Sequence, residues 1–115
     1  MTDKSELEEK IDELVAEIEE INGSLYDLAQ NSTSRGKIKT ERVDGAKVDE
    51  LDEKYEIWFT QAFTLVSEYI PERRADFREA YSDIDELLHF DGMEYTKADS
   101  YCGILRRVIS RQKNL

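Results

Sequence analysis

The most reactive side chains in this sequence belong to its only histidine, His89, and its only cysteine, Cys102. Glu86 precedes His89 by three positions, and this spacing puts a carboxylate and an imidazole on one helix face, as in di-metal bundles. Such a centre needs a second Glu-x-x-His pair on another helix. One imidazole with scattered carboxylates gives no closed ligand set, so the sequence predicts neither a metal site nor a cofactor.

The two residues also do not form a recognisable catalytic pair. A thiolate nucleophile with a histidine base needs a third, orienting group and an oxyanion site, and no motif for either is present. Cys102 lies between Tyr101 and Leu105, where a cysteine behaves as a small buried hydrophobe. Phosphate-binding loops, dinucleotide glycine patterns, nucleophile elbows and kinase signatures are also lacking. We therefore predict a non-enzymatic protein without a small-molecule ligand.

Two arginine clusters could instead bind an anion. The first follows Pro71 and alternates with acidic residues at the i,i+3 and i,i+4 spacings of helical ion pairs, which indicates a solvated charged face. Its members are Arg73, Arg74 and Arg78, with Glu72, Asp76 and Glu79 between them.

The second cluster is Arg106, Arg107 and Arg111, which has no acidic neighbour after Asp99. It suits the C-terminal end of a helix and could contact an acidic partner or RNA. The net charge of −11 repels phosphate backbones and anionic membranes, which argues against nucleic acid as the main partner.

Helices must position these residues, and the first is marked by a heptad pattern. Ser5 with Glu8 reads as a capping box for a helix that begins there, within an N-terminal coiled-coil segment over residues 1–34. The polar run over residues 31–36 is expected to turn the chain after this helix. Its apolar residues recur at alternating spacings of four and three, the pattern of a supercoiling seam. We call them the α-helical seam: Leu7, Ile11, Leu14, Ile18, Ile21, Leu25 and Leu28.

The second helix is expected to begin at Val48, after a polar linker over residues 35–47. Its apolar stripe is predicted as Leu51, Tyr55, Trp58, Ala62, Leu65 and Tyr69, and the two helices could pair. Residues 55–81 hold the only tryptophan and seven of the eleven aromatic residues, so they should form the core. Trp58 and Phe59 are most simply core residues, although one edge of the wide stripe could bind a protein.

Pro71 should end this helix near Ile70 and start the next one, because proline is tolerated only in a first turn. The next helix could run to about His89, with an interruption near Ser82 as an equal alternative. Asp91-Gly92 also fits a two-residue hairpin turn, which we consider second to a helix stop at Gly92. A last, basic helix is expected from Asp99 or Ser100, beside the acidic first helix.

Composition indicates one small all-α domain over residues 1–115. The chain is 39% hydrophobic and 37% charged with few glycines and prolines, as helical proteins are. Residues 1–34 hold ten acidic and two basic residues, whereas residues 103–115 hold four basic and no acidic ones. No signal peptide and no apolar run of about 20 residues is present, which predicts a cytoplasmic protein that does not cross a membrane.

About a quarter of the chain carries a family resemblance. Tyr55, Trp58, Phe59, Ala62, Leu65 and Val66, followed by Ile70-Pro71-x-Arg73-x-x-Asp76-Phe77-x-x-x-Tyr81, resemble a segment of prokaryotic helical modules linked to abortive-infection or toxin-type defence, some described as HEPN-like. HEPN ribonucleases carry an Arg followed after four to six residues by a His. His89 lies eleven residues after Arg78, so the resemblance implies a non-catalytic relative and carries over no catalytic residue.

The sequence thus predicts a protein–protein interaction or oligomerisation module, with either a protein partner or a second copy bound. We expect contacts through the α-helical seam, Trp58, Phe59 and the Arg106, Arg107 and Arg111 cluster. The alternatives are a HEPN-type ribonuclease using arginines and His89, and a nucleic-acid-binding module using the last helix. The sequence is compatible both with a first helix that packs within its own chain, in cis, and with one that pairs with another chain, in trans.

Overall fold

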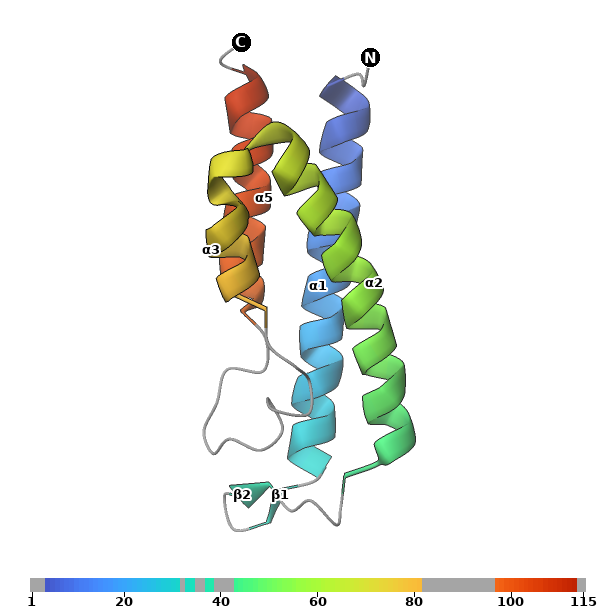
Figure 1. The fold of residues 1–115 in the computed structure, drawn as a ribbon. Coiled ribbons are helices and arrows are strands. Elements are labelled where there is room, and N and C mark those ends of the chain that lie inside the picture. Colours follow the sequence, from blue (N-terminus) through green and yellow to red (C-terminus); the bar gives the residue numbers. More distant parts are fainter. Residues whose placement is uncertain (1–3, 32, 35–36, 39–42, 82–96, 114–115) are drawn as a thin grey trace.

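The computed structural model describes residues 4–31, 33–34, 37–38, 43–81 and 97–113, and this part of the chain is an all-α bundle (Figure 1). A short antiparallel strand pair, β1 and β2, follows the first helix. The elements in chain order are α1 (Lys4–Asn31), β1 (Thr33–Ser34), β2 (Lys37–Ile38), α2 (Gly45–Tyr69), the 3-10 turn η2 (Pro71–Arg73), α3 (Arg74–Glu79) and α5 (Ala98–Lys113).

Local chemistry fixes both ends of α2. The carboxylate of Asp44 accepts hydrogen bonds from the backbone N–H groups of Ala46 and Lys47, at 3.1 and 3.4 Å, and so caps the free amides of the first turn. Ile70 leaves the helical conformation before Pro71, which starts the 3-10 turn. The predicted corner at Pro71 is confirmed, whereas α2 begins three residues earlier than the predicted Val48.

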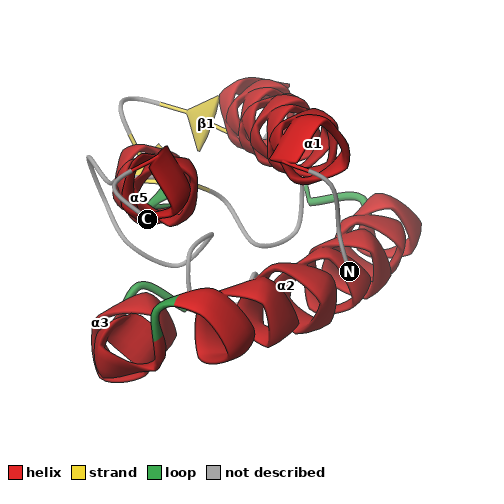
Figure 2. Cartoon of the chain, turned by 90° about the horizontal axis from the view of Figure 1, so that it is seen from above, coloured by secondary structure: helices red, strands yellow, loops and turns green. Residues whose placement is uncertain are grey.

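The helices form an elongated bundle in which α1 packs on both α5 and α2. In Figure 1, α1 runs antiparallel to α2 and to α5, and α3 folds back along α2. Figure 2, along the bundle, shows α1, α5, α3 and α2 around a common centre. The basic last helix therefore lies beside the acidic first helix, as predicted.

All seven residues of the α-helical seam are buried within this one chain. Their relative exposures range from 0% to 6%, and Val15 and Ala29 on α1 join them in the core. The structure thus uses the seam for packing in cis. Contacts with another chain through the whole seam would require α1 to leave the bundle, although Ile21 and Leu28 also line hollows at the surface.

The stripe on α2 differs from its predicted course beyond Ala62. The buried residues are Val48, Leu51, Tyr55, Trp58, Ala62 and Val66, continued by Ile70, while Leu65 and Tyr69 are only partly buried. A strict 3.5-residue repeat drifts around a straight helix of 3.6 residues per turn. The buried positions therefore advance by four residues from Ala62 to Val66 and again to Ile70, which keeps the stripe facing the core. The predicted step of three residues, from Ala62 to Leu65, turns away from it.

The helical segment after Pro71 ends at Glu79, and Tyr81 is no longer helical, so the predicted interruption near Ser82 is confirmed. The last helix, α5, begins at Ala98, one residue before the predicted Asp99. The predicted helix end at His89, the Glu86 pair and the turn at Asp91-Gly92 lie outside the described residues.

Replacing Ile18 by alanine tests whether α1 belongs to the core of the free chain. Ile18 is fully buried, so we expect Ile18→Ala to lower the free energy of unfolding by about 3 kcal/mol, from lost transfer energy and a residual cavity. Glu13→Ala, on the exposed side of the same helix, should change it by less than ~0.5 kcal/mol. Urea unfolding followed by Trp58 fluorescence measures both. A loss below ~0.5 kcal/mol for Ile18→Ala would contradict the cis packing.

Candidate interaction surface

Trp58 of α2 forms the central contact between α2 and α1. Its indole N–H donates a 2.8 Å hydrogen bond to the backbone carbonyl of Leu14, and the side chain is 1% exposed. The ring also meets Tyr101 of α5 edge to face, with centroids 4.8 Å apart, and stacks on Phe77 of α3 at 6.0 Å. One side chain therefore touches all the other helices of the described bundle, so the predicted core role of Trp58 is confirmed.

A pair of tyrosine hydroxyls supplies a second polar contact inside the core. The hydroxyls of Tyr55 on α2 and Tyr101 on α5 share a hydrogen bond of 2.6 Å. Burial raises the pKa of Tyr101 well above its usual range, and the charge and hydrogen bond of Tyr55 raise it further. Tyr101 therefore remains a neutral phenol at physiological pH, and its hydrogen bond to Tyr55 stabilises the α2–α5 contact.

Cys102 is buried, as predicted for a structural thiol. Burial raises the pKa of this thiol; Glu19 on α1 raises it further, and Arg106 on α5 opposes the rise. A thiol with a raised pKa is a poor nucleophile at neutral pH. The acidic α1 and the basic α5 thus both act on this thiol where the two helices meet.

Phe59 lies at the edge of the core rather than at its centre. It is partly buried and contacts the rings of Phe63, Phe77 and Tyr81, with centroids 4.7–5.6 Å apart. The guanidinium of Arg78 lies 5.0 Å from the centre of the Phe63 ring, a cation–π distance. The predicted ion pairing after Pro71 is seen between Arg73 and Asp76, at 3.2 Å.

The basic cluster of the last helix is only partly described. Arg106 and Arg107 are both exposed on α5, one turn beyond the exposed Gly103. Arg111 lies in α5, but its side chain is outside the described part of the structure.

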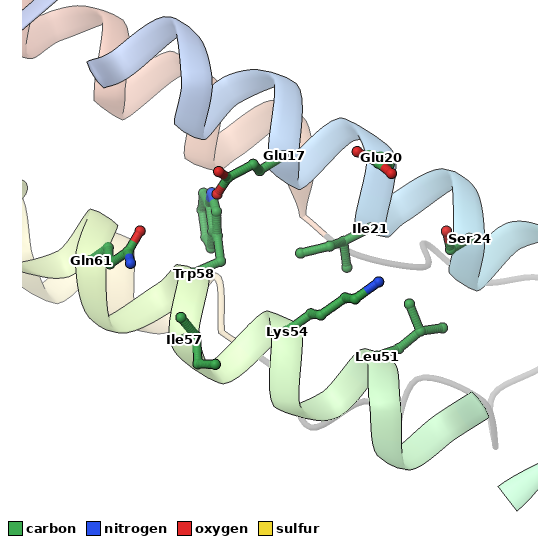
Figure 3. Close-up of a pocket in the computed structure, with 9 residues that line it drawn as sticks. All are labelled: Glu17, Glu20, Ile21, Ser24, Leu51, Lys54, Ile57, Trp58 and Gln61. Atoms are coloured by element: carbon green, nitrogen blue, oxygen red, sulfur yellow. The ribbon is translucent and has the colours of Figure 1, made fainter. Parts of the chain in front are cut away.

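A hollow lies between α1 and α2, and we call it the α1–α2 groove. Its central part has a volume of about 310 Å³ and opens to solvent. Figure 3 shows Ile21 of α1 and Leu51 of α2 pointing toward each other from the two helices. The lining residues are Glu17, Glu20, Ile21, Ser24, Leu51, Lys54, Ile57, Trp58 and Gln61.

The groove continues along the same two helices toward the strand pair. A second hollow of about 270 Å³ shares Ser24, Leu51 and Lys54 with the first. It adds Asp27, Leu28, Asn31, Lys47 and Glu50. Together the two hollows run along α1 from Glu17 to Asn31 and along α2 from Lys47 to Gln61; Figure 1 shows how these two helices lie side by side.

The groove combines an apolar floor with charged walls. Ile21, Leu51 and Trp58 form the floor, while Ile57 at its edge is 54% exposed. Lys54 crosses the surface toward α1 and forms an ion pair with Glu50 at 3.4 Å. Apolar area rimmed by polar and charged groups is the usual make-up of a protein-binding surface.

Sequence reasoning missed Ile57 and Lys54 as surface residues of interest. Ile57 precedes Trp58 but does not belong to the predicted apolar stripe. A large apolar residue on the polar side of an amphipathic helix was the sequence feature that could have indicated it. The groove as a whole depends on how α1 and α2 lie side by side, which periodicity alone does not determine.

Comparisons with known proteins give no match to a family model, a curated protein or a solved structure. Within the described residues, no group of three or more histidine, cysteine or acidic side chains is placed to hold a metal ion. The same part of the chain contains no helix with the length and apolar character needed to cross a bilayer.

Tyr101→Phe tests the buried hydroxyl pair. At pH 7 we expect the variant to be less stable by about 1 kcal/mol, the usual value of one hydrogen bond. A tyrosine in the unfolded chain ionises near pH 10, whereas Tyr101 resists ionisation when folded, so its stabilising contribution is present below pH ~10 and lost above it. Wild type should therefore lose up to about 1.4 kcal/mol more per pH unit than the variant above pH ~10.

Urea unfolding at intervals from pH 7 to 11.5 measures this difference. We expect the two stability curves to converge and then cross. Curves that stay parallel across the whole range would show that Tyr101 is not buried as a neutral phenol.

Proposed function

We propose that this chain is a non-enzymatic interaction module that binds another polypeptide in the α1–α2 groove. The observation that carries the proposal is Ile57, which is more than half exposed at the edge of a hollow that opens to solvent. The hollow is also lined by Ile21, Leu51 and Trp58, which are at most 8% exposed. A solvent-facing isoleucine contributes little to the stability of the free bundle. Contact with a partner would remove its surface from water.

The shape of the groove supports a polypeptide rather than a small molecule as the occupant. Small-molecule sites are enclosed and bury most of their ligand, whereas this hollow is open along its length and is lined by both helices. The buried Trp58 beneath it provides a rigid base, which limits the ordering cost of association. Rigid apolar anchors surrounded by polar groups are typical centres of binding energy.

The resemblance of residues 55–81 to helical modules of prokaryotic defence proteins suggests the kind of system in which the chain acts. We propose a helical adaptor role in such a system, and a cytoplasmic location in keeping with it. A ribonuclease of the HEPN type is not proposed, because the sequence lacks the Arg and His spacing of that family. The exposed Arg106 and Arg107 lie in a chain of net charge −11, which disfavours RNA.

Selection from a displayed library of random 16-residue peptides tests the proposal. We expect enriched peptides to bind the full chain and to lose at least tenfold in affinity for Ile57→Asn. The variant should unfold within ~0.5 kcal/mol of wild type, because the replaced side chain is exposed. Tyr26→Asn is the matched control, since Tyr26 is 48% exposed but does not line the groove.

Two results would overturn the proposal. One is a selection that enriches no peptide for the full chain. The other is a set of peptides that bind the Ile57→Asn and Tyr26→Asn variants equally well, which would place the binding surface elsewhere.

A further inference from the structure

We infer that the occupant of the α1–α2 groove is a basic amphipathic α-helix of a partner protein, an inference that rests on the proposed function. It adds the chemical class of the partner to the site. Three observations support this inference: the negative charge of the groove, its length along α1, and the packing of the basic helix α5 on a different side of α1.

The charge of the lining is predominantly negative. The two hollows together present four carboxylates and two ammonium groups. One ammonium group, on Lys54, is already paired with Glu50. The carboxylates belong to Glu17, Glu20, Asp27 and Glu50, and the ammonium groups to Lys47 and Lys54.

The rest of α1 strengthens this field, because residues 1–34 hold ten acidic and only two basic residues. Positive groups on a partner would therefore be attracted, and an acidic segment or a phosphate backbone would be repelled. Such complementarity chiefly sets the association rate and the choice of partner, while the apolar floor holds the complex together.

The length of the groove fits a helix. Along α1 it runs from Glu17 to Asn31, which at 1.5 Å per residue is about 21 Å, or about four helical turns. Between the two antiparallel helices the floor, continued by Leu28, is a narrow apolar line whose members are each at most 8% exposed. The exposed Ile57 at its edge widens the apolar surface that a partner can cover. A third helix with apolar residues at i, i+3, i+4 and i+7 presents a matching stripe.

The chain itself contains a helix of this kind packed on α1. The last part of α5, residues 103–113, has four basic and no acidic side chains, and α5 packs on α1. The charges of Glu19 and Arg106 both act on Cys102 at that contact. Glu17 and Glu20 are carboxylates of the same helix that line the groove instead. A basic helix in the groove would repeat the α1–α5 contact on a second side of α1.

Three synthetic 16-residue helical peptides with one shared leucine stripe test the inference. Their remaining positions carry lysine and arginine, glutamine, or glutamate. By fluorescence anisotropy at 50 mM NaCl with the full chain, we expect the basic peptide to bind at least tenfold more tightly than the neutral one, and the acidic one most weakly. The difference should shrink at 1 M NaCl, where the Debye length is about 3 Å.

Charge variants locate the effect. The double variant Glu17→Gln with Glu20→Gln should lower affinity for the basic peptide at least fivefold and leave the neutral peptide unchanged. The matched control is Glu9→Gln with Asp12→Asn, which removes the same charge from exposed positions of α1 outside the groove. Its effect on the basic peptide should be less than twofold.

Several outcomes would overturn the inference. Equal binding of the basic and neutral peptides, both weakened by Ile57→Asn, would refute the charge of the partner and leave the proposed function standing. Equal effects of the two charge variants would show attraction to the whole acidic surface. Binding of none of the three peptides would refute the helical occupant, and the library selection would then decide the proposed function separately. Self-association in light scattering that Ile57→Asn abolishes would make the occupant a second copy.

Discussion

The structure depends on the burial of one apolar seam on α1. Seven seam residues at alternating spacings of four and three face the rest of the chain, and none of them is more than 6% exposed. Both α2 and α5 pack on α1. The indole of Trp58 adds direction to this contact through its hydrogen bond to the Leu14 carbonyl. A polar group buried at that depth needs such a partner, so the bond fixes how α2 lies along α1.

Burying the seam in cis also determines which surfaces are left for function. The residues that flank the seam become the walls of the α1–α2 groove, and most of them are acidic because α1 itself is acidic. The elongated shape, 52 × 21 × 17 Å, keeps this groove long and open. Trp58 is buried in the core and Phe59 is partly buried against it, whereas Ile57 is the large apolar side chain of α2 that is exposed.

Much of the fold is predictable from the sequence because helical periodicity and helix ends are local properties. The seam, the corner at Pro71, the buried Cys102 and the basic last helix follow from spacing and residue type. The hydrogen bonds of Trp58 with Leu14 and of Tyr55 with Tyr101 join residues 44 and 46 positions apart, and periodicity says nothing about such pairs. The shift from Leu65 to Val66 reflects the pitch of a straight helix. The groove includes Ile57 and Lys54, which lie off the stripe, so it becomes visible only when the helices are placed together.

Hydrogen exchange of the native chain tests the central claim, that α1 is part of the core of a single chain, most directly. We expect the amides of α1 from Ile11 to Leu25 and the indole N–H of Trp58 to exchange as slowly as the slowest amides of α2 and α5. Their protection should also be the same at low and high protein concentration, because the contacts are intramolecular. Fast exchange in α1 beside slow exchange in α2, or protection that rises with concentration, would contradict the account and show that the seam is buried by a second chain.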